Sequence, residues 1–453
     1  MTTPVEANNI IYLEKKRDLM DYLIRASKPE EQWRIGMEVE KLVVDKDTGE
    51  AVSFNRIETL LTNLERSGKW KAISENNRII GLKGRNSSIT LEPGGQLELS
   101  GEICSDIHCA RAELSDYIAE IVDEAGQIGL CFLGLGVQPF TQVNEIDWLP
   151  KERYSVMGPY MLKKGDMGQI MMKQSAGLQV NLDFSDKQVY CEMMHTAFSI
   201  VPLIYALFAN SPVRDGEPTG FLSTRGEIWS RTDRDRTGII HGFLSENADF
   251  ETYVDYAINI PMYFIVRNGR LIDLTGESLT FKRYMSEGFD KYRATVDDWD
   301  LHLSTIFPEA RMRPQIEIRT SDSLPPYYIS SLAAFLKGLL YDKAAREEIR
   351  SIFKDLSNEE RENIYKQSWR LGLKTPVKGR TLREVVIDSL DIAGHSLKRQ
   401  GRKNDRGLDE AIYLEGAREI AESGVTLAER LLKCWKGSRK DKLTALVEHC
   451  GFK

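Results

Sequence analysis

Four segments of the chain alternate apolar and polar residues with a period of two. They are residues 35–44, 96–100, 178–184 and 315–319. Successive side chains of an extended backbone point to opposite faces, so each segment is predicted to be a strand with one face in the core. The other face gathers acidic residues, because Glu38 and Glu40 flank Val39, and Glu98 separates Leu97 from Leu99. The pattern is typical of a half-buried antiparallel sheet.

A tight turn precedes the second of these strands. Pro93-Gly94-Gly95 separates residues 88–92 from residues 96–101, and proline followed by glycines favours a chain reversal. We therefore expect two short strands hinged here, with Glu92 next to the hinge.

Helical periodicity dominates elsewhere. We expect a helix over about residues 9–27, a long helix capped by Ser105-Asp106 and ending near Gly126, an apolar helix from Ser185 to Phe208, and a buried strand over residues 130–137. After Pro325 the pattern predicts helices over residues 327–341, 344–356, 358–371, 381–400, 408–422 and 426–435. The sequence thus predicts an α+β fold with an antiparallel sheet and a helical C-terminal third. We expect a catalytic core of residues 1–325 and a helical segment of residues 326–453 packed on it.

Composition narrows the possible partners. The 453 residues have a formal charge of −7, which disfavours a nucleic-acid surface because phosphate binding requires a basic face. No apolar run approaches the roughly 20 residues of a membrane span. The N-terminal residues show no signal or transit pattern, which predicts a cytoplasmic protein. A monomer and a homodimer are both compatible with the sequence.

The six cysteines are scattered, with no Cys-x-x-Cys pair. Neither a structural zinc site nor a disulfide scaffold is expected from this spacing. Cys104 and Cys109, beside the predicted start of the long helix, are interpreted as reduced, buried residues, with a redox role as the alternative.

The acidic face of the predicted sheet points to a divalent metal. Like charges on neighbouring strands destabilise a sheet unless something neutralises them, and only Lys41 and Arg319 are interleaved with the glutamates. Hard carboxylate oxygens suit Mg²⁺. For any single strand, a polar face simply exposed to water is the alternative.

A second unusual segment, residues 225–238, contains four arginines and two aspartates. Guanidinium groups bind phosphate oxygens in pairs of hydrogen bonds, whereas Asp233 and Asp235 offer the alternative of a solvated salt-bridge network. Together with a carboxylate face, the arginines indicate ATP chemistry. The P-loop class is excluded because no Gly-x-x-x-x-Gly-Lys-Ser/Thr occurs, and Gly134-Leu135-Gly136 lacks the third glycine of a dinucleotide fingerprint.

Six motifs resemble those of the glutamate–cysteine ligases of plants and proteobacteria, which are carboxylate–amine ligases of the glutamine synthetase-like superfamily. They are GMEVEK (36–41), LEPGGQLELSG (91–101), FLGLGVQP (132–139), QVNLDF (179–184), FANSP (208–212) and TDRDRTG (232–238). The resemblance covers about residues 33–435 and implies an antiparallel sheet curved into a funnel and flanked by helices. It also implies that ATP phosphorylates the γ-carboxylate of glutamate and that the amine of cysteine displaces phosphate. The product would be γ-glutamylcysteine, formed in the first step of glutathione biosynthesis.

The resemblance further implies Mg²⁺, with Mn²⁺ as a substitute, and ATP as co-substrate. The implied metal ligands are Glu38, Glu40, Glu92, Glu98, Gln179 and Glu317. Arg319 would contact the transferring phosphoryl group as a catalytic residue, with pairing to a glutamate across the strands as the alternative. Residues for the nucleotide phosphates or the glutamate carboxylate would be Arg225, Arg231, Arg236 and Asn181, and Arg236 is a second catalytic candidate.

Three segments depart from the family pattern. Members tend to read Gly-Gly-Pro-Trp-Arg-Arg where this chain has Ser323-Leu324-Pro325-Pro326-Tyr327-Tyr328, the Met-Arg-x-Tyr pattern appears as Met157-Gly158-Pro159-Tyr160, and KQSAG (173–177) precedes Gln179. These segments are expected in places that line a substrate pocket, so another amine acceptor is the alternative function. A phosphotransferase that stops at the phosphorylated intermediate and a non-catalytic nucleotide sensor are further alternatives.

Overall fold

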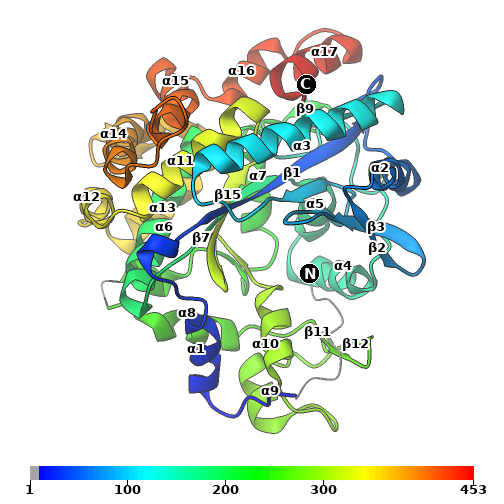
Figure 1. The fold of residues 1–453 in the computed structure, drawn as a ribbon, viewed down its shortest axis with the longest axis vertical. Helices are drawn as coiled ribbons and strands as arrows, with labels where there is room; N and C mark the ends of the chain where they lie inside the picture. Colours follow the sequence, from blue (N-terminus) through cyan, green and yellow to red (C-terminus); the bar gives the residue numbers. More distant parts are fainter. Residues whose placement is uncertain (1–9, 246) are drawn as a thin grey trace.

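The computed structural model describes residues 10–245 and 247–453. At its centre lies one large antiparallel sheet with strand order β14-β15-β7-β1-β5-β4-β3-β2, in which β6 also pairs with β1, and helices cover the sheet (Figure 1). The strands are β1 (Ile35–Asp45), β2 (Lys71–Glu75), β3 (Arg78–Lys83), β4 (Ser88–Leu91), β5 (Leu97–Ser100), β6 (Leu130–Leu133), β7 (Gly177–Leu182), β14 (Ala310–Arg313) and β15 (Gln315–Asp322). The predicted α+β class with an antiparallel sheet is confirmed.

The register of the central strands places the predicted site residues side by side. Glu38 pairs with Gln179 on β7, Glu40 pairs with Glu98 on β5, and Glu317 pairs with Asn181 on β7. Directly paired residues of antiparallel strands point to the same face, so these side chains share one side of the sheet.

The strands end where the backbone finds other partners. β4 and β5 form the predicted hairpin around Pro93-Gly94-Gly95. β6 stops at Leu133 instead of reaching residue 137, because the N–H of Gly134 donates to the carbonyl of Cys450 and that of Gly136 donates to the carbonyl of Asn210. The apolar run thus continues as buried backbone between segments distant in the sequence.

Two long helices of the first two thirds begin at capping residues. Asp106 caps α3 (Ile107–Gln127) and Asp186 caps α6 (Lys187–Leu207), each by accepting a hydrogen bond from a backbone N–H of the first turn. The first helix, α1 (Lys16–Ile24), is shorter than expected, and residue 9 lies outside the described residues. Helices that the sequence analysis did not predict are α2 (Phe54–Arg66), α4 (Glu152–Lys164), α5 (Gly168–Gln174), α7 (Thr224–Ser230), α8 (Phe250–Ile258), α9 (Phe281–Glu287) and α10 (Val296–Leu303).

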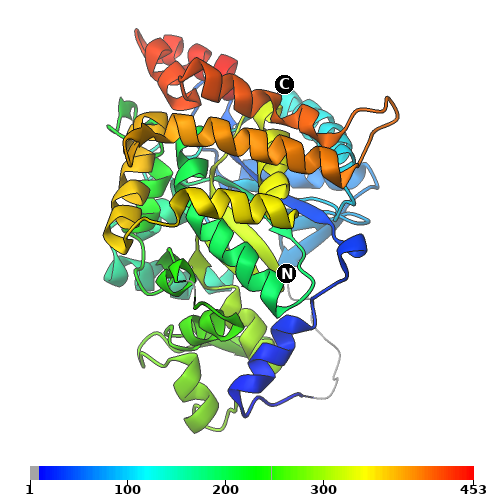
Figure 2. The same ribbon diagram turned by 90° about the vertical axis from the view of Figure 1, so that its left-hand side faces the viewer.

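The C-terminal third is helical, as predicted. Its helices are α11 (Pro326–Leu340), α12 (Lys343–Phe353), α13 (Asn358–Leu371), α14 (Leu382–Gln400), α15 (Glu415–Ser423), α16 (Leu427–Cys434) and α17 (Arg439–Cys450). The last of these was not predicted, and α15 starts late because residues 410–414 form a 3-10 turn. α13 and α14 contact α6, and α11 contacts α14, so these helices form layers over one side of the sheet (Figure 2).

Cys104 and Cys109 form a disulfide, with Cα atoms 5.7 Å apart. The expectation that they are reduced residues is therefore wrong. The physical reason is the capping turn at Asp106, which folds the chain back so that the cysteine preceding α3 reaches the one in its first turn.

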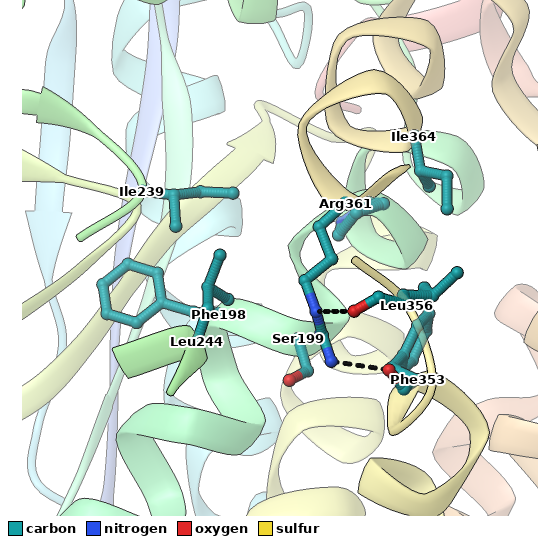
Figure 3. A pocket seen from close by; sticks show the side chains of 9 residues that line it. Phe198, Ser199, Ile239, Leu244, Phe353, Leu356, Arg361 and Ile364 are labelled. Carbon is teal, nitrogen blue, oxygen red and sulfur yellow. Dashed lines mark hydrogen bonds between the residues drawn. The ribbon is translucent and has the colours of Figure 1, made fainter. Parts of the chain in front are cut away.

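No helix among the described residues is long and apolar enough to cross a membrane. A small pocket lies among α6, α12 and α13 (Figure 3). It is lined by Phe198, Ser199, Pro202, Ile239, Leu244, Phe353, Leu356, Arg361 and Ile364. Its one charged side chain, Arg361, donates to the carbonyls of Leu356 and Phe353, and the hydroxyl of Ser199 donates to the carbonyl of His195, so both polar side chains of the lining have partners.

Candidate active site

Three carboxylates of the shared sheet face accept hydrogen bonds from neighbouring polar groups. Glu40 accepts hydrogen bonds from Gln179 Nε2 at 2.8 Å and from the backbone N–H of Gly177. Glu38 accepts one from Asn181 Nδ2 at 3.1 Å. Glu98 accepts from Thr90 and Ser100, and Glu92 lies at the β4–β5 hairpin.

The pKa shifts of three of these acids arise from burial and from one another's charge. Burial, followed by repulsion from Glu317 and Glu98, raises the pKa of Glu38 to about 8. Burial, Glu92 and Glu98 raise the pKa of Glu40 to about 8 in the same way, and burial and Glu98 raise that of Glu92. Carboxylates that repel one another this strongly can be ionised at the same time only if a cation neutralises part of their charge.

Glu317 differs because it already has cationic partners. Arg311 donates to both of its carboxylate oxygens, at 2.8 and 3.0 Å, and Arg319 also contacts it. Burial alone would raise the pKa of Glu317, but the two guanidinium groups outweigh it and lower the pKa to about 2.

Arg319 lies within the acidic face. Its Nη1 contacts Glu317 and Gln179, and its guanidinium carbon is 5.8 Å from the centre of the Phe307 ring. Arg319 therefore lies beside these carboxylates, and its pairing with Glu317 is the contact that the alternative interpretation predicts. Its contact with the transferring phosphoryl group stays a prediction.

Arg225 bonds to the backbone of the strand that carries Arg319. It is buried in α7, and its Nη1 donates to the carbonyls of Arg319 and Thr320 at 3.1 and 3.2 Å. The side chain therefore supports the backbone that carries Arg319. Asn181, in contrast, lies in the acidic face through its bond to Glu38.

Arg231 and Arg236 are not brought to the carboxylates. Arg236 is fully buried and donates to Asp233, to the carbonyls of Thr305 and Pro261, and to Tyr160. Arg231 is exposed and pairs with Asp166 and Glu227. For these two residues the salt-bridge alternative describes the contacts better than a nucleotide site.

The three departures from the family pattern differ in their contacts with the acids. Gly177 of KQSAG donates its N–H to the carboxylate of Glu40, and Ser323 donates its hydroxyl to the backbone carbonyl of Glu40. Tyr327, in contrast, is exposed, and Gly158 faces the Trp148 ring, from which an added Cβ would be 3.1 Å. That these segments line the substrate pocket stays a prediction.

Arg311 was missed by the sequence analysis. It pairs directly with Glu317 across the β14–β15 hairpin. Reading residues 310–318 as a hairpin around Pro314 would have placed the two charges opposite each other, because paired positions share a face. In the described residues, no group of three or more His, Cys, Asp or Glu side chains is arranged so that the group could hold a metal ion.

Comparison with known proteins gives a consistent result. The model of glutamate–cysteine ligase family 2 (GCS2) matches residues 34–449. The chain is 38% identical over 424 residues to glutamate–cysteine ligase A, chloroplastic, of Oryza sativa subsp. indica, covering 93% of this chain and 85% of the relative. It is 37% identical over 425 residues to the chloroplastic enzyme of Arabidopsis thaliana, covering 93% and 80%.

One solved structure has a similar fold. The crystal structure of glutamate–cysteine ligase from Francisella tularensis in complex with AMP aligns with a TM-score of 0.54 over 92% of this chain and 88% of that chain, at 13% sequence identity. At this identity the likeness concerns the fold alone.

The plant relatives also correct one prediction. Their names place them in the chloroplast, which contradicts the cytoplasmic location expected from the N-terminal residues. The prediction rested on the composition of a few N-terminal residues, and composition of so short a segment is weak evidence for the compartment of a protein. With a family model matched over most of its length and two such relatives, the chain belongs to glutamate–cysteine ligase family 2.

Proposed function

We propose that the protein is an ATP-dependent ligase that joins the γ-carboxylate of glutamate to the amine of cysteine. The reaction proceeds through γ-glutamyl phosphate, and it forms γ-glutamylcysteine in the first step of glutathione biosynthesis. The observation that supports this most is the convergence of Glu38, Glu40, Glu92, Glu98 and Glu317 on one face of the sheet. The names of the plant relatives support the same substrates.

The residues present fit Mg²⁺. The raised pKa values of Glu38 and Glu40 mark carboxylates whose charge lacks a counter-ion. Mg²⁺ usually keeps several waters and takes only one or two protein carboxylates plus substrate phosphates, so a closed cage of protein ligands is not required. The candidate ligands are Glu38, Glu40, Glu92 and Glu98, of which one or two would bind each ion, and the amide oxygen of Gln179, which contacts Arg319 in the structure. When bound, it neutralises the charge of the ATP phosphates.

Glu317 has a different place in this proposal from the other acids. Arg311 and Arg319 already neutralise the charge of Glu317, so the main role of Glu317 is to orient Arg319. The guanidinium of Arg319 then faces the acidic site and stabilises the negative charge of the phosphoryl group during transfer. No serine or cysteine nucleophile is needed, because ATP supplies the activating group.

A phosphate-release assay with ATP, Mg²⁺, glutamate and a panel of amines tests the proposal. We expect release that depends on glutamate and is greatest with cysteine. Greater release with another amine would reject cysteine as the acceptor. A stable phosphorylated product without an amide would instead indicate a phosphotransferase.

Requirement for the metal is tested separately. Removing divalent cations with EDTA should abolish product formation, and adding Mg²⁺ or Mn²⁺ should restore it. Full activity in EDTA would contradict the assignment of the glutamates as metal ligands. Mg²⁺ with ATP should also raise the thermal midpoint, because ligands that bind only the folded state stabilise it.

A further inference from the structure

Two cations lie next to Glu92 without bonding to it. Lys151 precedes α4, and Arg153 is the second residue of that helix. Lys151 Nζ donates to the carbonyl of Leu91 at 2.9 Å, which fixes it at the end of β4. Among the described residues, neither side chain forms an ion pair.

The guanidinium of Arg153 forms no hydrogen bond in the described part of the chain. Its Nε is buried and has no partner, and its guanidinium carbon is 5.7 Å from the centre of the Phe264 ring. Arg225 also has a buried Nε without a partner, but its Nη1 donates to two carbonyls, and Arg311 binds Glu317 with two hydrogen bonds. A buried polar group without a partner costs free energy that a ligand can recover.

The charge around the pair depends on whether the nearby acids hold a metal. Lys151 and Arg153 repel each other, and the carboxylates that attract Lys151 are those of Glu92, Glu98 and Glu75. If Glu92 and Glu98 are metal ligands, their charge is shared with the metal and offsets the two cations less. Ammonium and guanidinium groups in this arrangement match the oxygens of a carboxylate or phosphate.

We propose that Lys151 and Arg153 form an oxyanion subsite beside Glu92, which binds a phosphate or carboxylate group of a substrate. The inference rests on the proposed function for the identity of the substrates. Arg153 presents its unused N–H groups to the anion, while Lys151 retains two N–H groups beyond its bond to Leu91. The subsite lies on the Glu92 side of the acidic face, whereas Arg319 lies on the Glu317 side.

The test combines kinetics with direct binding. Arg153→Gln and Arg153→Lys are compared with Lys163→Gln, an exposed residue in the last turn of the same helix. KM is measured for ATP, glutamate and cysteine in turn, and calorimetry measures binding of ATP with Mg²⁺ and of glutamate alone. We expect Arg153→Gln to raise KM for one substrate about 10- to 100-fold, the range for losing a charged hydrogen bond. Arg153→Lys should recover part of the loss, and Lys163→Gln should match the wild type.

The substrate affected identifies the anion. A change for ATP assigns the subsite to phosphate, and a change for an amino acid assigns it to a carboxylate. Unchanged constants for all three substrates would overturn the proposal, as would a lower thermal midpoint with no substrate-specific change. If the wild type has no ligase activity but still binds ATP in a manner dependent on Arg153, the proposed function fails while the subsite stands.

Discussion

At the scale of single residues, burial of Glu38 in the acidic face lowers the stability of the fold at neutral pH. Glu38 has an ordinary pKa of 4.5, which burial, Glu317 and Glu98 raise to about 8. Between these two values the unfolded chain has released a proton that the folded chain keeps, so folding costs progressively more as pH rises from 4.5 to 8. The cost vanishes below pH 4.5, where both states are protonated.

Glu38→Gln removes this cost. In EDTA at pH 7.5 we expect the free energy of unfolding to rise by about 1–2 kcal/mol, a value reduced from the full shift because the side chain is partly exposed. The gain should disappear at pH 4.5. With Mg²⁺ and ATP, kcat should fall on the order of 10³-fold because a metal ligand is lost. Urea unfolding at both pH values and phosphate release check the two effects, and a variant less stable than the wild type at pH 7.5 would refute the first.

Arg236 provides the opposite case, a sequence-predicted catalytic residue whose contacts are structural. Arg236→Met leaves Asp233 buried without its partner, so we expect the unfolding free energy to fall by about 3 kcal/mol. At low temperature, kcat per folded molecule should stay within about threefold of the wild type. Arg231→Gln, on the exposed arginine of the same segment, should change stability by less than about 0.5 kcal/mol. A loss of kcat on the order of 10³-fold in a fully folded Arg236→Met protein would restore the catalytic role.

At the scale of elements, the β4–β5 hairpin that positions Glu92 depends on Gly94, which packs closely against another backbone segment. A Cβ on Gly94 would lie 2.2 Å from the carbonyl oxygen of Lys173, so Gly94→Ala must displace one of the two backbones. We expect a loss of about 1–3 kcal/mol together with reduced activity, since the hairpin carries Glu92 and Glu98. Thermal unfolding and phosphate release measure both.

A matched glycine in the same protein serves as the control. Gly126 lies in α3 with no atom within 4 Å of an added Cβ, so Gly126→Ala should stabilise by about 0.5–1 kcal/mol through helix propensity. Equal effects of the two substitutions would show that the close approach at Gly94 is unimportant.

Elements with strong local signals were predictable from the sequence, and those determined by distant contacts were not. α13 was predicted with its exact bounds because Ser357 and Glu360 form a capping box at its start. The hairpin at Pro93-Gly94-Gly95 and the alternation of β1 were equally local. The end of β6 was not, because Cys450 and Asn210 determine it from far along the chain. The disulfide was missed although the cap at Ser105-Asp106 was predicted, because the spacing of the cysteines does not show which two of them the capping turn brings together.

At the scale of the whole molecule, the acidic face is assembled from four strands that are up to about 280 residues apart in the sequence. Alternation showed which residues of each strand share a face, but only the strand order places β15 beside β7 and β7 beside β1. For this reason the glutamates were predictable as a set, whereas the arginines were not. Guanidinium groups pair locally as readily as they bind ligands, and the surrounding fold decides between the two. The division into residues 1–325 and 326–453 stays a prediction.

The stability of the molecule in acid should depend on one buried histidine, His302. His302, in α10, stacks on Phe281, and its Nε2 lies 2.9 Å from the carbonyl of Ala257. Burial lowers its pKa from 6.5 to about 3, against the opposing effect of the Ala257 hydrogen bond. The unfolded chain therefore takes up a proton below pH 6.5 that the folded chain refuses until about pH 3. The stability that this residue contributes is complete above pH 6.5 and is lost by up to about 1.4 kcal/mol per pH unit as pH falls.

His302→Gln, which keeps a donor for Ala257, tests this dependence. Urea titrations at several pH values between 6 and 4 give the slope of the unfolding free energy against pH. The variant should reduce this slope by up to the amount that corresponds to uptake of one proton. The exposed His241→Gln should leave that slope unchanged. If both variants have the wild-type slope, groups other than His302 control the loss of stability in acid.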